Sequence, residues 1–215
     1  MDFLNALILL LNYIFVPALA YGSQLAIGAI FVTLIYGILR FANFATGDMM
    51  SFGTMVAILF TWYFQSLGLS LGFLPTALLA IPFAILFMGL YMLIIDKFVF
   101  KYYRLNKSPP VQLAMVSIGV MFVTQAVVRI IIGPSDRRFF DGEKFLIKAN
   151  EFKEMTGLNE GLAIKSTQVI TIVVTIILVS TLFWFLNKTK TGKSMRAYSD
   201  NEDLALLSGI DPKKI

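Results

Sequence analysis

The sequence predicts an all-α fold, a polytopic bundle of five to six transmembrane helices. Composition is the first observation behind this prediction, since 58% of the 215 residues are hydrophobic and only 14% are charged. Soluble domains are about 45–50% apolar and about 25% charged, because a globule needs a large polar surface. We therefore expect lipid to surround much of the chain.

Apolar stretches of membrane length are the second observation. About 20 helical residues cross the hydrocarbon, and backbone groups in lipid must find hydrogen-bond partners within the chain, which favours helices. The five main spans are expected at residues 22–39, 49–64, 74–95, 111–132 and 166–186. Residues 3–20 either form a sixth span or lie in the membrane interface, because Pro17 and Gly22 leave their course open.

Local features support the individual spans. The second span ends in Trp62 and Tyr63, which are typical of the membrane interface. The third contains Pro82, and membrane helices tolerate proline where neighbouring groups satisfy the freed carbonyl. The fourth carries Arg129 within a turn of its end, where a long side chain reaches the headgroups. The fifth is the clearest span, because it contains no charged residue.

Basic residues next to the spans predict the topology. They form two clusters, namely Lys97, Lys101, Arg104 and Lys107, followed by Lys188, Lys190, Lys193 and Arg196. Short segments rich in Lys and Arg stay in the cytoplasm, and the two spans between the clusters place the loop at about residues 133–163 outside. We therefore expect residues 1–186 to form the transmembrane bundle and residues 187–215 to form a cytoplasmic tail.

The residue types that are missing exclude several kinds of chemistry. The chain has no Cys and no His, so it lacks disulfides, thiolate metal ligands and the usual general base. The net charge is +5, and the basic residues cluster beside apolar runs. This pattern favours a role in membrane topology over nucleic-acid binding. We expect no enzymatic activity, no metal and no cofactor.

Gly192-Lys193-Ser194 resembles the end of a phosphate-binding loop. The complete motif needs a glycine five residues before Gly192 and a preceding strand, whereas Asn187 and a membrane helix stand there. We interpret the segment as a basic turn next to the membrane, so this chain does not hydrolyse ATP itself.

The cytoplasmic tail carries the pattern of a short capped helix at about residues 200–208. Ser199 and Glu202 have the spacing of a capping box, and Asp200, Glu202 and Asp203 lie in the expected first turn. Gly209 is expected to end the helix in a left-handed conformation, and Pro212 prevents its continuation. A narrow stripe formed by Leu204, Leu207 and Ser208 suits docking in a protein groove, or packing against this protein's own cytoplasmic surface.

These tail residues resemble a motif of ABC importer permeases. Asp203-Leu204-Ala205 followed by Gly209 is similar to their Glu-Ala-Ala-x-x-x-Gly loop, which fits a groove on the ATPase subunit, with Asp in place of Glu and Leu in place of the first Ala. Further segments resemble the branched-chain amino acid permease family, namely residues 36–38, 43–48, 96–97, 103–105, 117–119 and 191–197. In residues 43–48, Thr46 replaces a His of the family and Asp48 replaces a Glu. The similarity extends from about residue 22 to residue 215.

The resemblance implies a function. It implies a membrane permease subunit of an ABC importer in the bacterial inner membrane, forming part of the path for branched-chain or related amino acids. It further implies ABC ATPase partner subunits that supply the energy, a second permease subunit, and a periplasmic substrate-binding protein at the outer loop. The expected contacts with the ATPase are made by Asp203, Leu204, Ala205, Leu207 and Gly209. Family members continue with further helices, so we expect this chain to be an N-terminal fragment.

The polar segment at residues 43–48 separates two apolar runs and allows two interpretations. Either it lines the substrate path, or it forms a cytoplasmic hairpin between two spans. The candidate path residues are Asn43, Phe44, Thr46, Gly47 and Asp48. A charge at the bilayer centre costs about 2.5–3.5 kcal/mol, which favours a position of Asp48 near the surface.

Two other classes of function compete with the permease. An ion-coupled secondary transporter or channel needs carboxylates inside the membrane, and the main expected spans contain none beyond the edge. A membrane scaffold that transports nothing leaves the caps and the stripe of the tail helix unexplained.

Overall fold

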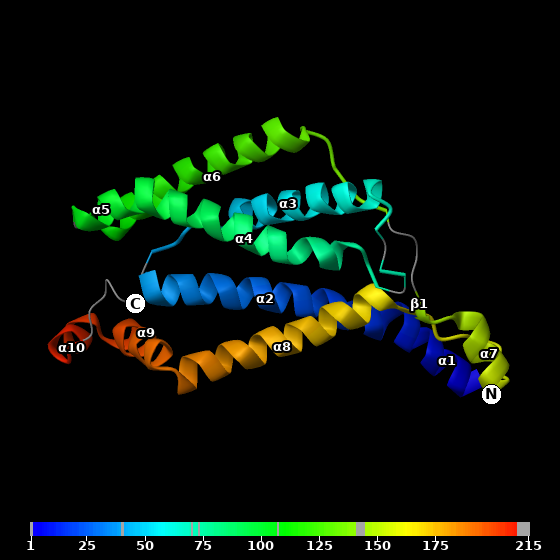
Figure 1. Cartoon of the computed structure of the whole chain (residues 1–215). Coiled ribbons are helices and arrows are strands. Elements are labelled where there is room, and N and C mark those ends of the chain that lie inside the picture. Colours follow the sequence, from blue (N-terminus) through cyan, green and yellow to red (C-terminus); the bar gives the residue numbers. More distant parts are fainter. Residues whose placement is uncertain are drawn as a thin grey trace. The chain divides into compact units, whose positions relative to one another are not determined.

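The computed structural model describes residues 2–39, 41–69, 71–72, 74–106, 108–140 and 145–209, and these residues are mainly helical (Figure 1). The chain divides into two compact units. The terminal unit comprises Met1–Ile38 and Glu143–Ile215, and the central unit comprises Leu39–Gly142. This architecture confirms the expected all-α membrane fold.

The terminal unit begins with one long helix. Helix α1 (Asp2–Leu10), the π-helical turn η1 (Leu11–Phe15) and α2 (Val16–Leu39) follow each other without a break. The expectation that residues 3–20 form an element separate from the span at residues 22–39 is therefore wrong. In η1 the Val16 N–H donates to the carbonyl of Leu11, five residues back. We attribute the continuity to this wider turn, because it precedes Pro17, whose ring would collide with a carbonyl of a regular helix.

The length of this helix limits the number of membrane crossings. The apolar part, Phe3–Ile38, has 36 residues. At 1.5 Å per residue it extends about 54 Å, which exceeds the roughly 30 Å of hydrocarbon but is too short for two spans and a turn. The helix therefore crosses the membrane once at most.

The rest of the terminal unit contains a small hairpin and the tail. Strand β1 (Phe145–Ile147) pairs antiparallel with β2 (Ile164–Lys165), and α7 (Ala149–Thr156) lies between them in sequence. The Ala163 N–H donates to Oδ1 of Asn12, 3.3 Å away, which attaches this segment to the long helix. Helices α8 (Ser166–Lys188), α9 (Lys190–Asp200) and α10 (Glu202–Leu207) follow.

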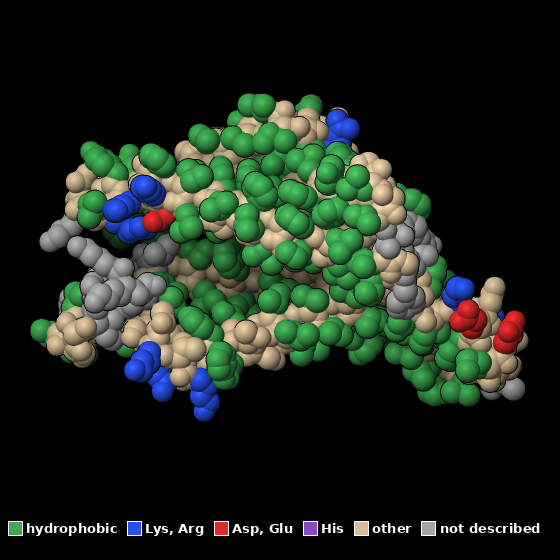
Figure 2. Space-filling view, in the orientation of Figure 1, with side chains coloured by type: hydrophobic (Ala, Val, Ile, Leu, Met, Phe, Trp, Pro, Cys, Tyr) green, Lys and Arg blue, Asp and Glu red, His purple; other side chains and the backbone are tan. Residues whose placement is uncertain are grey.

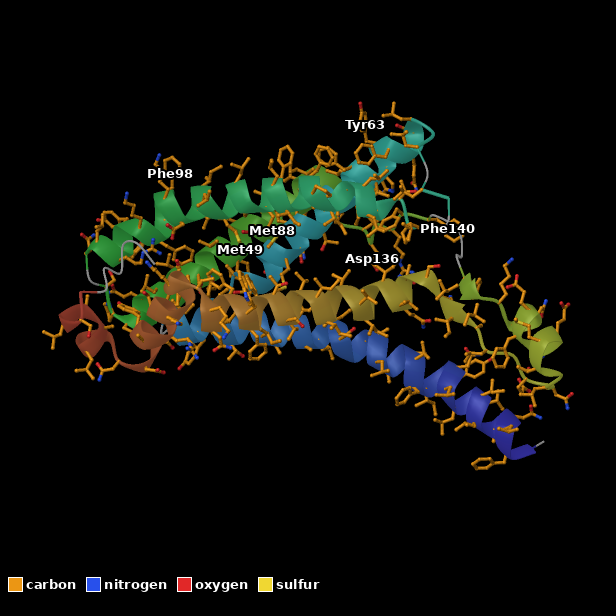
Figure 3. The ribbon with its side chains drawn as sticks, turned by 60° about the horizontal axis from the view of Figure 1, so that its bottom comes forward. Met49, Tyr63, Met88, Phe98, Asp136 and Phe140 are labelled. Atoms are coloured by element: carbon orange, nitrogen blue, oxygen red, sulfur yellow. The ribbon has the colours of Figure 1, made fainter. Side chains whose placement is uncertain are left out.

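The central unit is a bundle of three helical rods. They are α3 (Thr46–Ser66), the continuous rod of α4 (Ala77–Ile95), η2 (Asp96–Phe100) and α5 (Lys101–Leu105), and α6 (Pro110–Ile132). Helix α3 packs against both α4 and α6. Six buried residues form the core, namely Phe41, Ala45, Met49, Phe100, Leu113 and Val120. Met88 of α4 packs against this core, and Figure 3 shows it next to Met49.

Four helices of the described residues are long and apolar enough to cross a membrane. They are Phe3–Ile38, Ala77–Leu105, Pro110–Ile132 and Ser166–Lys188. Figure 2 shows that hydrophobic side chains cover most of the visible surface, while Lys and Arg lie towards the helix ends. Helix α3 has 21 residues, which is sufficient length, but it is more polar and more buried than the other spans. A helix that is enclosed by protein does not need an apolar face on every side.

Candidate functional site

The beginning of α9 packs closely against the last turn of α8. The hydroxyl of Thr189 donates to the Phe185 carbonyl at 2.7 Å and accepts the Gly192 N–H at 3.0 Å. A Cβ at Gly192 would collide with the Phe185 carbonyl oxygen and lie 2.6 Å from Cα of Leu186. This close approach requires glycine. Gly192-Lys193-Ser194 therefore belongs to α9, and our interpretation of these residues as a turn is wrong, because Thr189 already caps a helix there.

A hydrogen bond joins α9 to the other long helix of the terminal unit. The hydroxyl of Ser199 donates to the carbonyl of Gly37 in α2, with an oxygen–oxygen distance of 2.8 Å. A Cβ at Gly37 would lie 3.4 Å from the Ser199 oxygen, so the glycine lets the two helices approach. Helix α9 is thus attached to α8 at its beginning and to α2 near its end.

The expected capping box between Ser199 and Glu202 is wrong. Ser199 lies inside α9, and its hydroxyl is engaged by Gly37. The cap is Asn201, which has an extended backbone and accepts the Leu204 N–H on Oδ1 at 3.1 Å. Asparagine is among the preferred N-cap residues, so its place directly before Glu202 was a usable signal.

Helix α10 is shorter than the expected helix at about residues 200–208. It has six residues, from Glu202 to Leu207. Asp200 ends α9, whereas Asp203 lies in the first turn of α10. Gly209 has a φ of 80°, and its N–H donates to the Leu206 carbonyl at 3.0 Å, which confirms the left-handed terminus. Pro212 lies outside the described residues.

The residues of α10 divide into a packed and an open side. Ala205 is only 3% exposed, and α10 packs against α9. Leu204 and Leu207 are 60% and 84% exposed. Ser208 and Gly209 are exposed as well. Of the expected coupling residues, Ala205 is buried, while Leu204, Leu207 and Gly209 are exposed.

Side chains of the polar segment at residues 43–48, before α3, form hydrogen bonds with the backbone of the same segment. Oδ1 of Asn43 accepts the Ala45 N–H at 3.1 Å, and the Asn43 carbonyl accepts the Thr46 hydroxyl at 2.8 Å. The Phe44 N–H donates to the hydroxyl of Ser117 in α6 at 3.0 Å. Sequence reasoning gave Ser117 no role, although Ser117 lies in one of the segments that resemble the permease family.

The five candidate path residues do not all point in one direction. The side chains of Asn43 and Thr46 form hydrogen bonds with the backbone of their own segment, and Thr46 is buried. Phe44 is 54% exposed, Gly47 is exposed, and Asp48 is half-buried in the first turn of α3. The structure therefore brings Asn43 and Thr46 together and leaves Phe44 and Gly47 on the outside.

This segment lies towards the basic end of the central unit. Phe41 packs against Phe100 with ring centroids 6.0 Å apart, and Phe100 is the last residue of η2. Lys97, Lys101 and Arg104 lie in η2 and α5. Ser117 follows Pro110 by about two helical turns, which corresponds to roughly 10 Å along α6. The segment thus contacts the first half of α6, the half that follows α5 in sequence.

Comparison with known proteins settles the family. Residues 14–215 match the family described as "Branched-chain amino acid transport system / permease component". The chain belongs to this family. It is 26% identical over 198 residues to the high-affinity branched-chain amino acid transport system permease protein LivH of Escherichia coli (strain K12). The LivH protein of Salmonella typhimurium (strain LT2) shows the same identity over the same length.

The aligned region has a defined extent. It covers 90% of this chain and 60% of each of these two relatives. The chain therefore spans about 60% of the length of the curated relatives that it matches. No solved structure matches it.

Proposed function

We propose that this chain is a membrane permease subunit of an ABC importer that forms part of the translocation path for branched-chain or related amino acids. The observation that carries the proposal is α10, a capped helix with three exposed leucines, of which Leu207 is the most exposed at 84%. Membership of the permease family supports the same function. ATP hydrolysis on partner ABC ATPase subunits supplies the energy.

The proposed arrangement places the chain in the bacterial inner membrane as a multi-pass protein. Residues 1–186 form the bundle and residues 187–215 form the cytoplasmic tail. The basic segments next to α4 and α8 support this topology, since Lys and Arg accumulate on the cytoplasmic side. The loop at residues 133–163 then faces a periplasmic substrate-binding protein, and a second permease subunit completes the path.

The contacts of the tail suggest how a partner moves the membrane helices. Six helical residues are too few for stability in isolation, so α10 depends on its caps and on Ala205. Helix α9 connects α10 with α8 through Gly192 and with α2 through Ser199. An ATPase that closes on nucleotide and displaces α10 would move both membrane helices, because α9 is attached at both ends.

We place the polar segment before α3 in the substrate path. The path residues are Asn43, Phe44, Thr46, Gly47 and Asp48. The amide and hydroxyl groups of Asn43 and Thr46 stabilise a break between α2 and α3, and such breaks are tolerated where they line a cavity. Gly47 is exposed, which agrees with a position beside the path.

Co-expression with an ABC ATPase subunit and recovery of the complex tests the coupling contact. We expect Leu207→Asp to reduce the recovered ATPase by at least about 10-fold, because burying an unpaired carboxylate at the centre of an interface is costly. Leu206→Asp is the matched control, since Leu206 lies on the other side of α10 and is less exposed than Leu207. Equal recovery of ATPase with wild type and Leu207→Asp would refute the contact.

A further inference from the structure

One side of α9 is basic and open. Lys190, Lys193 and Arg196 follow each other at intervals of three, which places them on neighbouring positions of one helix face. All three are exposed, and the exposed Lys188 precedes them at the end of α8. We call these four residues the basic face. Figure 2 shows Lys and Arg side chains at the end of the terminal unit where α8 meets α9.

The attachments of α9 define how it lies relative to the two long helices. Its beginning touches Phe185 and Leu186, which lie in the last turn of α8. Its penultimate residue, Ser199, bonds to Gly37, which lies in the last turn of α2. Helix α9 therefore bridges the ends of two membrane-length apolar helices. A helix that joins two such ends runs along the membrane surface and not through the hydrocarbon.

The four cations of the basic face are exposed. In the part of the chain that the structure describes, none of the four takes part in an ion pair. Asp200 is the only acidic residue of α9. A face of this kind at the end of a membrane span is complementary to phosphate, since lysine offers a compact charge and arginine a planar pair of donors.

Two cations elsewhere in the chain differ in this respect. Arg104 forms two contacts with the Asp96 carboxylate, at 2.7 and 2.8 Å. Lys148 pairs with Glu151 at 3.4 Å. Each of these two cations has an acidic partner within the protein, whereas the exposed cations of the basic face remain available to a ligand.

We propose that the basic face of α9 binds the phosphate headgroups of anionic phospholipids in the leaflet where α8 ends. Amphipathic helices lie in the membrane interface when cations face the headgroups, and polybasic segments next to a span are attracted by anionic lipid. The lipid contact holds α9 along the membrane surface and thereby sets the distance of α10 from the bilayer. The inference does not depend on the proposed transport function, because it concerns only the terminal unit and lipid.

A single fluorescent label tests the lipid contact. The chain has no cysteine, so Ala197→Cys gives a unique labelling site. Ala197 is exposed and follows Lys193 by four residues on the same side of α9. The labelled full chain is reconstituted in nanodiscs of phosphatidylcholine with increasing fractions of phosphatidylglycerol, and quenching by neutral acrylamide reports its exposure to water. We expect quenching to fall as the anionic fraction rises, and added salt to reverse the effect.

The decisive variant is Lys190→Gln combined with Lys193→Gln and Arg196→Gln. Glutamine retains helix propensity and length but removes the charge. We expect the phosphatidylglycerol fraction at half-maximal protection to rise at least about fivefold, because each of the three juxtamembrane charges contributes about that factor and the variant removes all of them. The control is Lys148→Gln combined with Lys153→Gln in α7, which leaves the label response unchanged.

Three outcomes would overturn the proposal. The first is quenching that does not depend on phosphatidylglycerol, and the second is the same dependence in the triple variant and in the parent. The third is protection that appears only when a purified ATPase subunit is added, which identifies the basic face as a protein contact. Far-ultraviolet circular dichroism of the reconstituted proteins shows whether the variants retain their helices.

Discussion

The two units of this protein are stabilised in different ways. The central unit encloses a continuous core around Met49, in which a glycine and a polar pair allow the helices to approach closely. In the terminal unit, the buried side chains are few and mostly small, and specific contacts near the helix ends join the elements. The difference indicates that the central unit depends on packing throughout its length, whereas the terminal unit depends on a few junctions.

Two tryptophans allow the units to be followed separately. Trp62 lies in α3 of the central unit, and Trp184 lies in α8 of the terminal unit. Replacing either one with Phe leaves a single fluorescent reporter, because the chain contains only 2 Trp residues. Denaturation of each single-Trp protein in detergent then measures the stability of one unit.

The largest effect is expected at the junction of α8 and α9. Gly192→Ala places a Cβ against two backbone atoms, the Phe185 carbonyl oxygen and the Leu186 Cα, and backbone cannot rotate away. We expect a loss of about 3 kcal/mol, at the upper end of the range for overpacking, in the transition reported by Trp184. Gly28→Ala in α2 is the control, because nothing lies within 4 Å of its new Cβ. An unchanged Trp184 transition in Gly192→Ala would show that the junction does not stabilise the terminal unit.

A smaller effect is expected from overpacking in the central unit. A Cβ at Gly53 would lie 2.8 Å from the sulfur of Met88, whose side chain is flexible and adapts in part. We expect Gly53→Leu to lower the free energy of unfolding by about 1–3 kcal/mol, measured through Trp62. Gly89→Leu in α4 meets open space and serves as the control. Equal transitions for the two variants would contradict the close packing of α3 on α4.

A hydrogen bond between two helices contributes less. The hydroxyls of Tyr91 in α4 and Thr124 in α6 lie 2.8 Å apart, and Thr124 is fully buried. We expect Thr124→Val to cost about 0.6–1.7 kcal/mol, the range measured for such bonds in membrane proteins. Thr54→Val is the control, because it makes the same chemical change at an exposed residue whose hydroxyl donates to the Met50 carbonyl of its own helix. If both variants unfold alike through Trp62, the bond between α4 and α6 adds no stability.

The smallest effect is expected at the link between α9 and α2. Ser199→Ala removes the bond to the Gly37 carbonyl, and a typical bond of this kind contributes about 0.5–1.5 kcal/mol. We expect faster amide hydrogen exchange in α9 with little change in the Trp62 transition. Ser194→Ala lies in the same helix and provides the comparison. Unaltered exchange in α9 would mean that this bond does not fix its position.

The candidate site was predicted in part. Composition and apolar runs were sufficient to predict a helical membrane protein, and Gly209 was correctly expected to end the tail helix, because both features depend on local sequence. The exposed positions of Leu204 and Leu207 agree with the predicted stripe. The start of that helix was predicted wrongly, because Ser199 and Asn201 are both suitable caps and local rules do not decide between them.

By itself, the sequence determined that the chain is a helical membrane protein, where most of its apolar helices lie, and where the tail helix ends. The tertiary structure decided which polar groups are engaged. The Gly37 carbonyl, 162 positions before Ser199 in sequence, accepts the Ser199 hydroxyl. Asn201 therefore caps α10 in place of Ser199. A hydrophobic run predicts a membrane helix because the helix depends only on residues that are close in sequence. A hydrogen bond between distant residues depends on how the chain folds and brings them together.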